Sequence, residues 1–379
     1  MGVLRRLSKL PFVFDPVIGS KLEDLVIPKP PFRPEIGETY SFLAIGTRKL
    51  FDIKTDETRR KTRRFLREEL FKTTNSPESI EFKKRAFQIT SQLFNSEKGK
   101  DTNVSFLSNV ISIEECMYGN LHFGIDHHYG IALPFFRKFA KDVHKSSFLN
   151  KLKNGNSVCC LIDTGYEHTL AIEVDGETWT LNGSINCSEI ASVADLFMLT
   201  ISNEAENPKT LLIDSRIGGL SIDSISKNSF QLNFKGVQLT EENVLHLDQE
   251  LLSQFTAVAN LLQSTASQAR SELAFDLIRS SIRNRKVLED DVKKILADAK
   301  TEICVNRLYV DNCLSNHLER KISPILAAMC RLRTYEVEKN VLKRIPEYLL
   351  NPHYKSYVDN FINSDKLRAA ITNRIEDDA

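Results

Sequence analysis

The hydrophobic period of the chain changes twice, and this change limits the folds that the chain can adopt. Up to about residue 152 the spacing of apolar residues is helical. From about residue 157 to 239 the period becomes two, in short runs such as "SVCCLI", "TLAIEV" and "TWTLNGS" that are separated by Gly, Asn, Asp and Pro. Evenly spaced strands with such turn residues are typical of a compact antiparallel barrel or sandwich.

The helical period returns after residue 248, where Leu251, Phe255, Leu262 and Leu273 follow one another at helical steps. Two helical segments of about thirty residues exceed the usual globular length, and long helices normally pack as an antiparallel bundle. We therefore predict an α+β fold of four parts. They are a basic, Pro-rich leader (1–36), an N-terminal helical domain (37–152), a central small antiparallel β barrel or sandwich (153–246) and a C-terminal bundle of long helices (247–379).

A strongly basic segment, "TDETRRKTRRFLREELF", lies in the N-terminal region. We predict a helix that is capped by Thr55 or Asp56 and carries one basic face. Phosphates or anionic lipid could bind the run from Arg59 to Arg67, but a solvated helix face explains these charges more simply.

The composition excludes several classes of protein. The 51 basic and 50 acidic residues nearly cancel, so no global field points to nucleic acid. The longest apolar runs, such as "SPILAAMC", are too short to span a bilayer. Seven cysteines without a CxxC pair favour buried thiols in a reducing compartment over a disulfide framework or a zinc site.

The first residues, "MGVLRRLSKLPF", have the composition of an address segment. Arg5, Arg6 and Lys9 alternate with apolar residues, and no acidic residue precedes Asp15. This pattern is typical of a short mitochondrial presequence. The alternative is an untargeted basic tail on a cytoplasmic protein.

Three passages resemble one enzyme family in order and spacing. "FLNKLKNGNSVCCLID" is similar to "YLPKLASGE…CLTEP", "WTLNGSINCSEIASVADLFML" to "YVLNGSKxWITNGxxADxxxV", and "FQLNFKGVQLTEENVL" to "LxFxxVxVPxENLLG". These are motifs of the acyl-CoA dehydrogenase family. The resemblance implies FAD, an acyl-CoA ligand, a Glu that removes the α proton, and a homodimer or homotetramer that assembles through the C-terminal helices.

The family's flavin contacts are mostly substituted. Where the family has Trp-Ile-Thr-Asn beside the flavin ring, the chain has Cys187, Ser188, Glu189 and Ile190, and Ile162 replaces the Thr of "CLTEP". The resemblance thus implies that the aromatic wall and two hydroxyl donors are missing. A carboxylate at Glu189 would repel a ring that becomes anionic on reduction, and its unpaired burial would be costly. We interpret the adjoining Asn-Gly pair at 182–183 as a tight turn.

The resemblance also leaves the catalytic base and the phosphate contacts in doubt. Phe255 occupies one of the two family positions for the base, and the other holds no Glu. Glu250 and Asp365 are candidates only in a different register, and an exposed helix-end carboxylate is the ordinary alternative for each. Arg285 keeps the family's phosphate-binding arginine, but the glycines of the second phosphate passage are missing. Adjacent His127 and His128 have no third ligand at metal-binding spacing, so we expect a helix-end or interface role for them.

These substitutions favour an acyl-CoA dehydrogenase-like protein that has lost catalysis and binds FAD weakly or not at all. It would act as a mitochondrial partner or assembly subunit, with a mitochondrial protein partner, or as an acyl-chain binder. The alternative is an active FAD-dependent acyl-CoA dehydrogenase of fatty-acid or branched-chain catabolism. The visible spectrum of the purified protein distinguishes the two.

Overall fold

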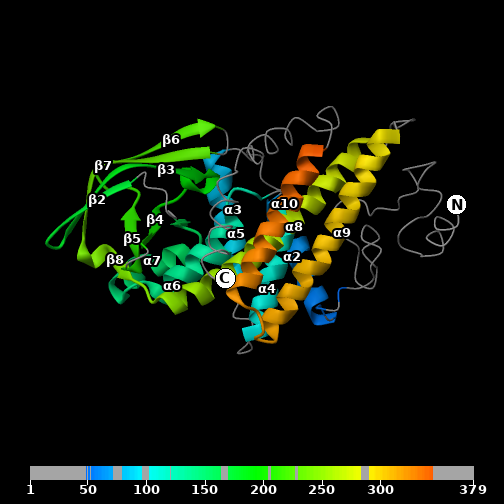
Figure 1. Ribbon diagram of the computed structural model, residues 1–379, viewed down its shortest axis with the longest axis horizontal. Helices are drawn as coiled ribbons and strands as arrows, with labels where there is room; N and C mark the ends of the chain where they lie inside the picture. The colour runs from blue at the N-terminus through cyan, green and yellow to red at the C-terminus, as the bar shows by residue number, and fades with distance from the viewer. Residues whose placement is uncertain are drawn as a thin grey trace.

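The computed structural model describes residues 48, 50–51, 53–70, 79–95, 102–119, 121–163, 170–203, 206–226, 229–282 and 290–344. In Figure 1 the strands form one end of the molecule, the long C-terminal helices form the other, and N-terminal helices lie between them. The predicted order of helices, β-sheets and helical bundle is thus confirmed. The leader (1–36) and the candidate residues Arg285 and Asp365 lie outside the described residues.

The N-terminal helices surround α4, which is the central helix of this part. Several apolar side chains of α4 are fully buried, among them Val110, Ile113 and Met117, because the helix packs against α2, α3 and α8. The helical elements are α2 (Ile53–Leu70), α3 (Ile80–Asn95), α4 (Thr102–Tyr118), α5 (Ile125–His127), the π-helical turn η3 (His128–Ala132), α6 (Leu133–Phe139) and α7 (Asp142–Lys153). Since α2 begins at Ile53, Thr55 and Asp56 lie within its first turn, and the prediction that one of them caps the helix is wrong.

The strands form two four-stranded sheets. The first has the order β1 (Cys159–Asp163), β4 (Leu196–Asn203), β5 (Glu206–Asp214), β8 (Val244–His246), and the second the order β2 (Leu170–Asp175), β3 (Thr178–Ser188), β7 (Ser229–Thr240), β6 (Leu220–Ser226). Every residue from Leu196 to Thr200 is buried, so the first sheet is covered on both faces. Burial in β3 and β7 is interrupted by exposed residues, which leaves one face of the second sheet toward solvent.

Two features of the sheets differ from the expectations. Among the described strands, β1 and β4 pair in parallel, whereas the other pairs are antiparallel. Asn182 and Gly183 do not form a turn but lie inside β3, where the register with β7 shifts and Gly183 has φ of 120°. Asn182 Oδ1 accepts a hydrogen bond from the Gly236 N–H of β7 at 2.7 Å. The register shift leaves Asn182 opposite both Lys235 and Gly236, so the extra residue of this β-bulge lies in β7.

The C-terminal part consists of three long helices, which Figure 1 shows side by side. They are α8 (Gln249–Ile282), α9 (Asp290–Leu318) and α10 (Pro324–Arg344), and each packs against the other two. The predicted apolar stripe of α8 is buried at Leu262, Ala266, Ala269 and Leu273. Within the described residues, we find no helix whose length and apolar character would let it cross a bilayer.

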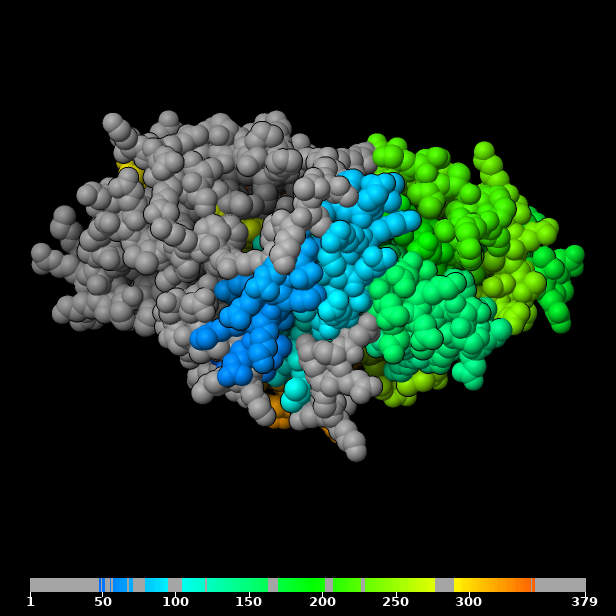
Figure 2. Space-filling model, turned by 180° about the vertical axis from the view of Figure 1, so that it is seen from behind, coloured from blue at the N-terminus to red at the C-terminus, as the bar shows by residue number. Residues whose placement is uncertain are grey.

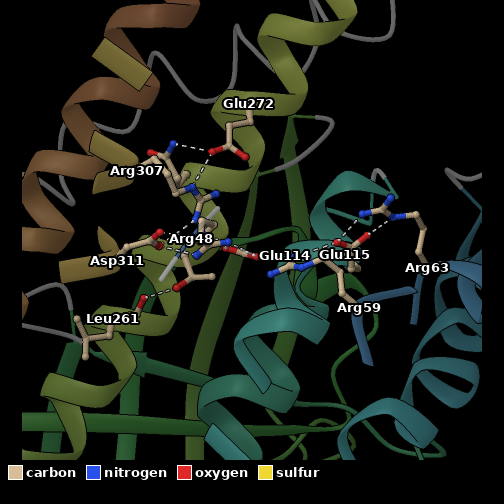
Figure 3. A network of polar contacts seen from close by, with 11 residues as sticks. Arg48, Arg59, Arg63, Glu114, Glu115, Leu261, Glu272, Arg307 and Asp311 are labelled. Atoms are coloured by element: carbon tan, nitrogen blue, oxygen red, sulfur yellow. Dashed lines mark hydrogen bonds and ion pairs between the residues drawn. The ribbon is translucent and has the colours of Figure 1, made fainter. Parts of the chain in front are cut away.

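A buried network of charged side chains joins the N-terminal helices to this bundle (Figure 3). Arg307 of α9 donates from Nε to Glu272 of α8 and from Nη1 to Glu114 of α4, each at 2.7 Å. The members of the network are Arg48, Arg59, Arg63, Glu114, Glu115, Glu272, Arg307 and Asp311. Four arginines face four carboxylates, so the network compensates its own charge and the desolvation cost of each member is offset.

The basic run of α2 contributes to this network. Arg59 is only 5% exposed and donates to Glu114 and Glu115, whereas Arg60, Lys61 and Arg64 are exposed. The prediction of a solvated helix face thus holds for Arg60, Lys61 and Arg64, but it is wrong for Arg59.

Candidate functional site

The segment that would wrap a flavin ring in the family connects the two sheets. β3 ends at Ser188, the short 3-10 helix η4 (Glu189–Ser192) follows, and β4 begins at Leu196 in the other sheet. Ile190 and Ala191 of η4 are buried, while Ser188 is exposed opposite Ser229. The connection is thus an anchored crossing between sheets, which explains why it is longer than a hairpin loop.

Gly124 fixes the position of η4 against the N-terminal helices. It precedes α5 with φ of 102°, and a Cβ atom at this position would lie 2.6 Å from Cβ of Ile190. Only glycine adopts this backbone without strain and leaves room for the isoleucine. The sequence analysis did not single out Gly124, although a glycine before a helical pattern is a signal for close approach.

An ion pair holds Glu189, the first residue of η4. Lys83 of α3 places its Nζ 2.6 Å from Glu189 Oε1, and the two side chains are 8% and 21% exposed. Figure 2 shows α3 lying against the part of the chain that contains the strands. Glu189 is therefore paired, and the unpaired burial that the sequence analysis considered does not occur. Lys83 lies on the buried face of α3 beside Phe82, Ala86 and Phe87. A lysine within this apolar stripe was the sequence signal that could have predicted a buried ion pair.

Cys187 and Ile162 belong to the region where β1 approaches β3. Cys160 and Ile162 are both buried and, two residues apart on a strand, point to the same face of β1. The Sγ atom of Cys160 lies 3.8 Å from that of Cys187. Ile162 therefore offers an alkyl group where the family has a hydroxyl, and Cys187 contacts a second thiol.

The two adjacent histidines bind the free edge of β1. Cys159 N–H donates to His128 Nδ1 and Leu161 N–H donates to His127 Nε2, each at 3.0 Å. His128 Nε2 in turn donates to the Leu152 carbonyl at 3.1 Å. Burial lowers the pKa of His128 to about 4, against the opposing effect of its backbone hydrogen bonds, so the ring is neutral near pH 7. The two imidazoles thus satisfy N–H groups of an edge strand that would otherwise be unpaired.

The two described positions considered for a catalytic base, Glu250 and Phe255, both lie in α8 and make other contacts. Phe255, at the first family position, packs its ring against Phe135 and Phe139 at centroid distances of 5.3 and 5.9 Å. Glu250 is exposed in the first turn of α8, where its carboxylate accepts from Gln254 Nε2 at 3.2 Å. The aromatic cluster keeps the first position apolar.

The residues at these positions do not fit a flavin ring. In the family an aromatic side chain and hydroxyl donors contact the isoalloxazine ring, and hydrogen bonds to the ring atoms tune its chemistry. Ile162 and Ile190 have no polar side-chain atom, the Glu189 carboxylate is turned to Lys83, and Cys187 contacts Cys160. The geometry supplies an ion pair and a thiol pair instead.

The chain is similar to known proteins over most of its length. No family model matches it. The mitochondrial long-chain specific acyl-CoA dehydrogenase of Sus scrofa is 25% identical over 345 aligned residues, which cover 78% of this chain and 77% of that protein. The acyl-CoA dehydrogenase of Geobacillus kaustophilus has a similar structure, with a TM-score of 0.69 at 17% identity over 88% of this chain and 99% of that one. A glutaryl-CoA dehydrogenase of Mycobacterium smegmatis in complex with FADH2 gives a TM-score of 0.66 at 12% identity over 84% and 92%.

The solved structures confirm the fold that the three motif passages indicated, with helices, β-sheets and a helical bundle in this order. In sequence and in fold the chain is thus distantly similar to the acyl-CoA dehydrogenases.

Proposed function

We propose that this protein keeps the acyl-CoA dehydrogenase scaffold but has lost the flavin-dependent reaction. The observation that carries the proposal is the replacement of the family's flavin contacts by Ile162 and Cys187, not the Lys83–Glu189 ion pair at the flavin loop. Because Lys83 compensates the carboxylate, repulsion of reduced flavin is weaker than for an unpaired Glu189. The missing contacts therefore weigh more than the charge: neither Ile162 nor Cys187 offers the hydroxyl or aromatic group that the family uses.

The position of Phe255 supports the same proposal. Removal of an α proton requires a base within hydrogen-bond reach of the substrate. A phenylalanine packed among aromatic rings cannot accept a proton, and Glu250 is exposed to solvent.

For the remaining role we propose a mitochondrial partner or assembly subunit, or an acyl-chain binder. The basic leader and the mitochondrial relative support this location. We further propose that the protein assembles as a homodimer or homotetramer through its C-terminal helices, with domains at 37–152, 153–246 and 247–379. Limited proteolysis with mass determination of the fragments tests these boundaries, because linkers are cleaved before packed elements.

The first experiment is a visible spectrum of the purified protein, with the Geobacillus kaustophilus enzyme purified in the same way as the control. We expect no flavin band and no binding of added FAD by calorimetry. A stoichiometric flavin band that an acyl-CoA bleaches would overturn the proposal in favour of an active FAD-dependent dehydrogenase.

A second measurement separates the two proposed roles. Titration of the protein with a long-chain acyl-CoA in a calorimeter reports whether a ligand site persists. Saturable binding supports the acyl-chain binder, whereas its absence together with a mitochondrial protein co-purified at fixed stoichiometry supports the partner or assembly subunit.

A further inference from the structure

Cys160 and Cys187 bring two thiols together from different sheets. Cys160 lies in β1 and Cys187 in β3, and their Sγ atoms are 3.8 Å apart. A disulfide needs its sulfur atoms at about 2 Å, with the two Cβ atoms about 4 Å apart. The thiols are therefore already in van der Waals contact, and a disulfide requires the two sulfur atoms to approach by about 2 Å.

The two thiols differ in exposure and in acidity. Cys160 is 2% exposed, whereas Cys187 is only partly buried. The side-chain hydrogen bond between them lowers the pKa of Cys187 and raises that of Cys160. The thiolate is the form of cysteine that reacts with oxidants, so Cys187 combines the more reactive form with the better access.

We propose that Cys160 and Cys187 form a hydroperoxide-sensitive dithiol that closes a disulfide between the two sheets. In the first step the Cys187 thiolate attacks an oxygen of the hydroperoxide. The O–O bond breaks, Cys187 becomes a sulfenic acid, and the second oxygen leaves as water or an alcohol. In the second step Cys160 attacks the Cys187 sulfur, the S–O bond breaks and water leaves. The two thiols lose two electrons and two protons in total, and the hydroperoxide is reduced.

The disulfide would act on the η4 loop. Cys187 is two residues before Glu189, which the ion pair with Lys83 holds against α3. A covalent link from β1 to the end of β3 would fix the same segment from its other side. Oxidation should therefore stabilise the crossing between the sheets, whether or not the protein binds flavin.

A second thiol pair in the chain serves as an internal control. Cys313 of α9 and Cys330 of α10 also hydrogen-bond to each other, but both are completely buried. Contact between sulfur atoms is thus common to both pairs, and access of the oxidant distinguishes them. Cys304, which is partly buried and outside both pairs, controls for exposure alone.

The test treats the reduced full-length protein with hydrogen peroxide, removes the peroxide, blocks the remaining thiols with N-ethylmaleimide in denaturant and maps the peptides by mass spectrometry. We expect a linked peptide containing Cys160 and Cys187, which dithiothreitol separates, while Cys313 and Cys330 are alkylated. Cys160→Ser should accumulate a sulfenic acid at Cys187 that dimedone traps. Cys304→Ser should behave like the wild type.

The proposal is overturned if Cys160 and Cys187 remain alkylatable while Cys304 is oxidised, or if both thiol pairs are oxidised at the same rate. The peptide map of the wild-type protein decides this even where a serine variant fails to fold.

Discussion

Lys83 of α3 and Glu189 of η4 form an ion pair at 2.6 Å between a helix and the crossing of the two sheets. The lysine side chain is the more enclosed of the two, at 8% exposed against 21%. The pair thus sets where the crossing lies relative to the N-terminal helices. Because both partners are largely removed from water, loss of one partner leaves a charge that the protein must desolvate.

The first prediction concerns this pair. Glu189→Gln leaves the enclosed ammonium without its carboxylate and should lower the free energy of unfolding by about 3 kcal/mol. Lys83→Met leaves the more exposed carboxylate and should cost about 1 kcal/mol. The double variant Lys83→Met/Glu189→Gln should be more stable than the sum of the single effects predicts, since no charge of this pair remains buried. Urea unfolding of the four proteins gives the coupling.

The exposed pair Lys321–Glu319 provides a matched control. Its side chains are 70% and 53% exposed, so the same double-mutant cycle should show no measurable coupling. Additive effects at Lys83 and Glu189 would show that the ion pair does not hold the loop.

The sequence could predict the elements whose pattern is local. The apolar steps from Leu251 to Leu273 predict α8, because one buried helix face repeats along the sequence. The alternation in "TWTLNGS" predicts β3 for the same reason, but it does not predict where the strand ends. Asn182 and Gly183 suit a turn or a bulge equally, and the Gly236 N–H of β7 decides between them.

The features that the sequence could not predict depend on partners far along the chain. Arg59 is buried because Glu114 and Glu115 of α4 accept its hydrogen bonds, and nothing near Arg59 in the sequence indicates this. Lys83 likewise takes its partner from η4. A charge is stable inside the protein only where such a partner exists, so its burial is a property of the fold.

The second prediction concerns the contact of Gly124 with Ile190. Gly124→Ala adds a methyl group 2.6 Å from Ile190 Cβ on a backbone with φ of 102°. We expect a loss of about 3 kcal/mol, of which overpacking supplies most and backbone strain the rest. Gly176→Ala is the control, because its φ is 61° and open space surrounds it. This variant should lose about 1 kcal/mol by denaturant unfolding. Equal losses in both variants would argue against close packing at η4.

The third prediction concerns the buried network. Arg307→Met leaves Glu272 without its arginine and removes one partner of Glu114. The expected loss is about 4 kcal/mol, because two buried carboxylates then each lose one charged partner. Arg216→Met is the control, since the Arg216 side chain is 82% exposed beside Asp214, and its stability should hardly change. Thermal unfolding at two salt concentrations tests the prediction further: the loss in Arg307→Met should persist at high salt.

The last prediction concerns pH and the docking of β1. Burial lowers the pKa of His128 from 6.5 to about 4 in the folded protein. Between these values the unfolded chain binds more protons than the folded protein, so stability is full above pH 6.5 and falls as the pH decreases toward 4. From pH 7 to pH 5 the loss due to His128 is about 2 kcal/mol, since one pKa unit corresponds to about 1.4 kcal/mol.

Urea unfolding at pH 7 and pH 5 measures this loss. His128→Gln cannot titrate, so its stability should decline by about 2 kcal/mol less than that of the wild type. Part of the decline should remain, because burial also lowers the pKa of His122 to about 3 and that of His127. A His128→Gln variant with the full wild-type decline would show that protonation of His128 is not what loosens β1.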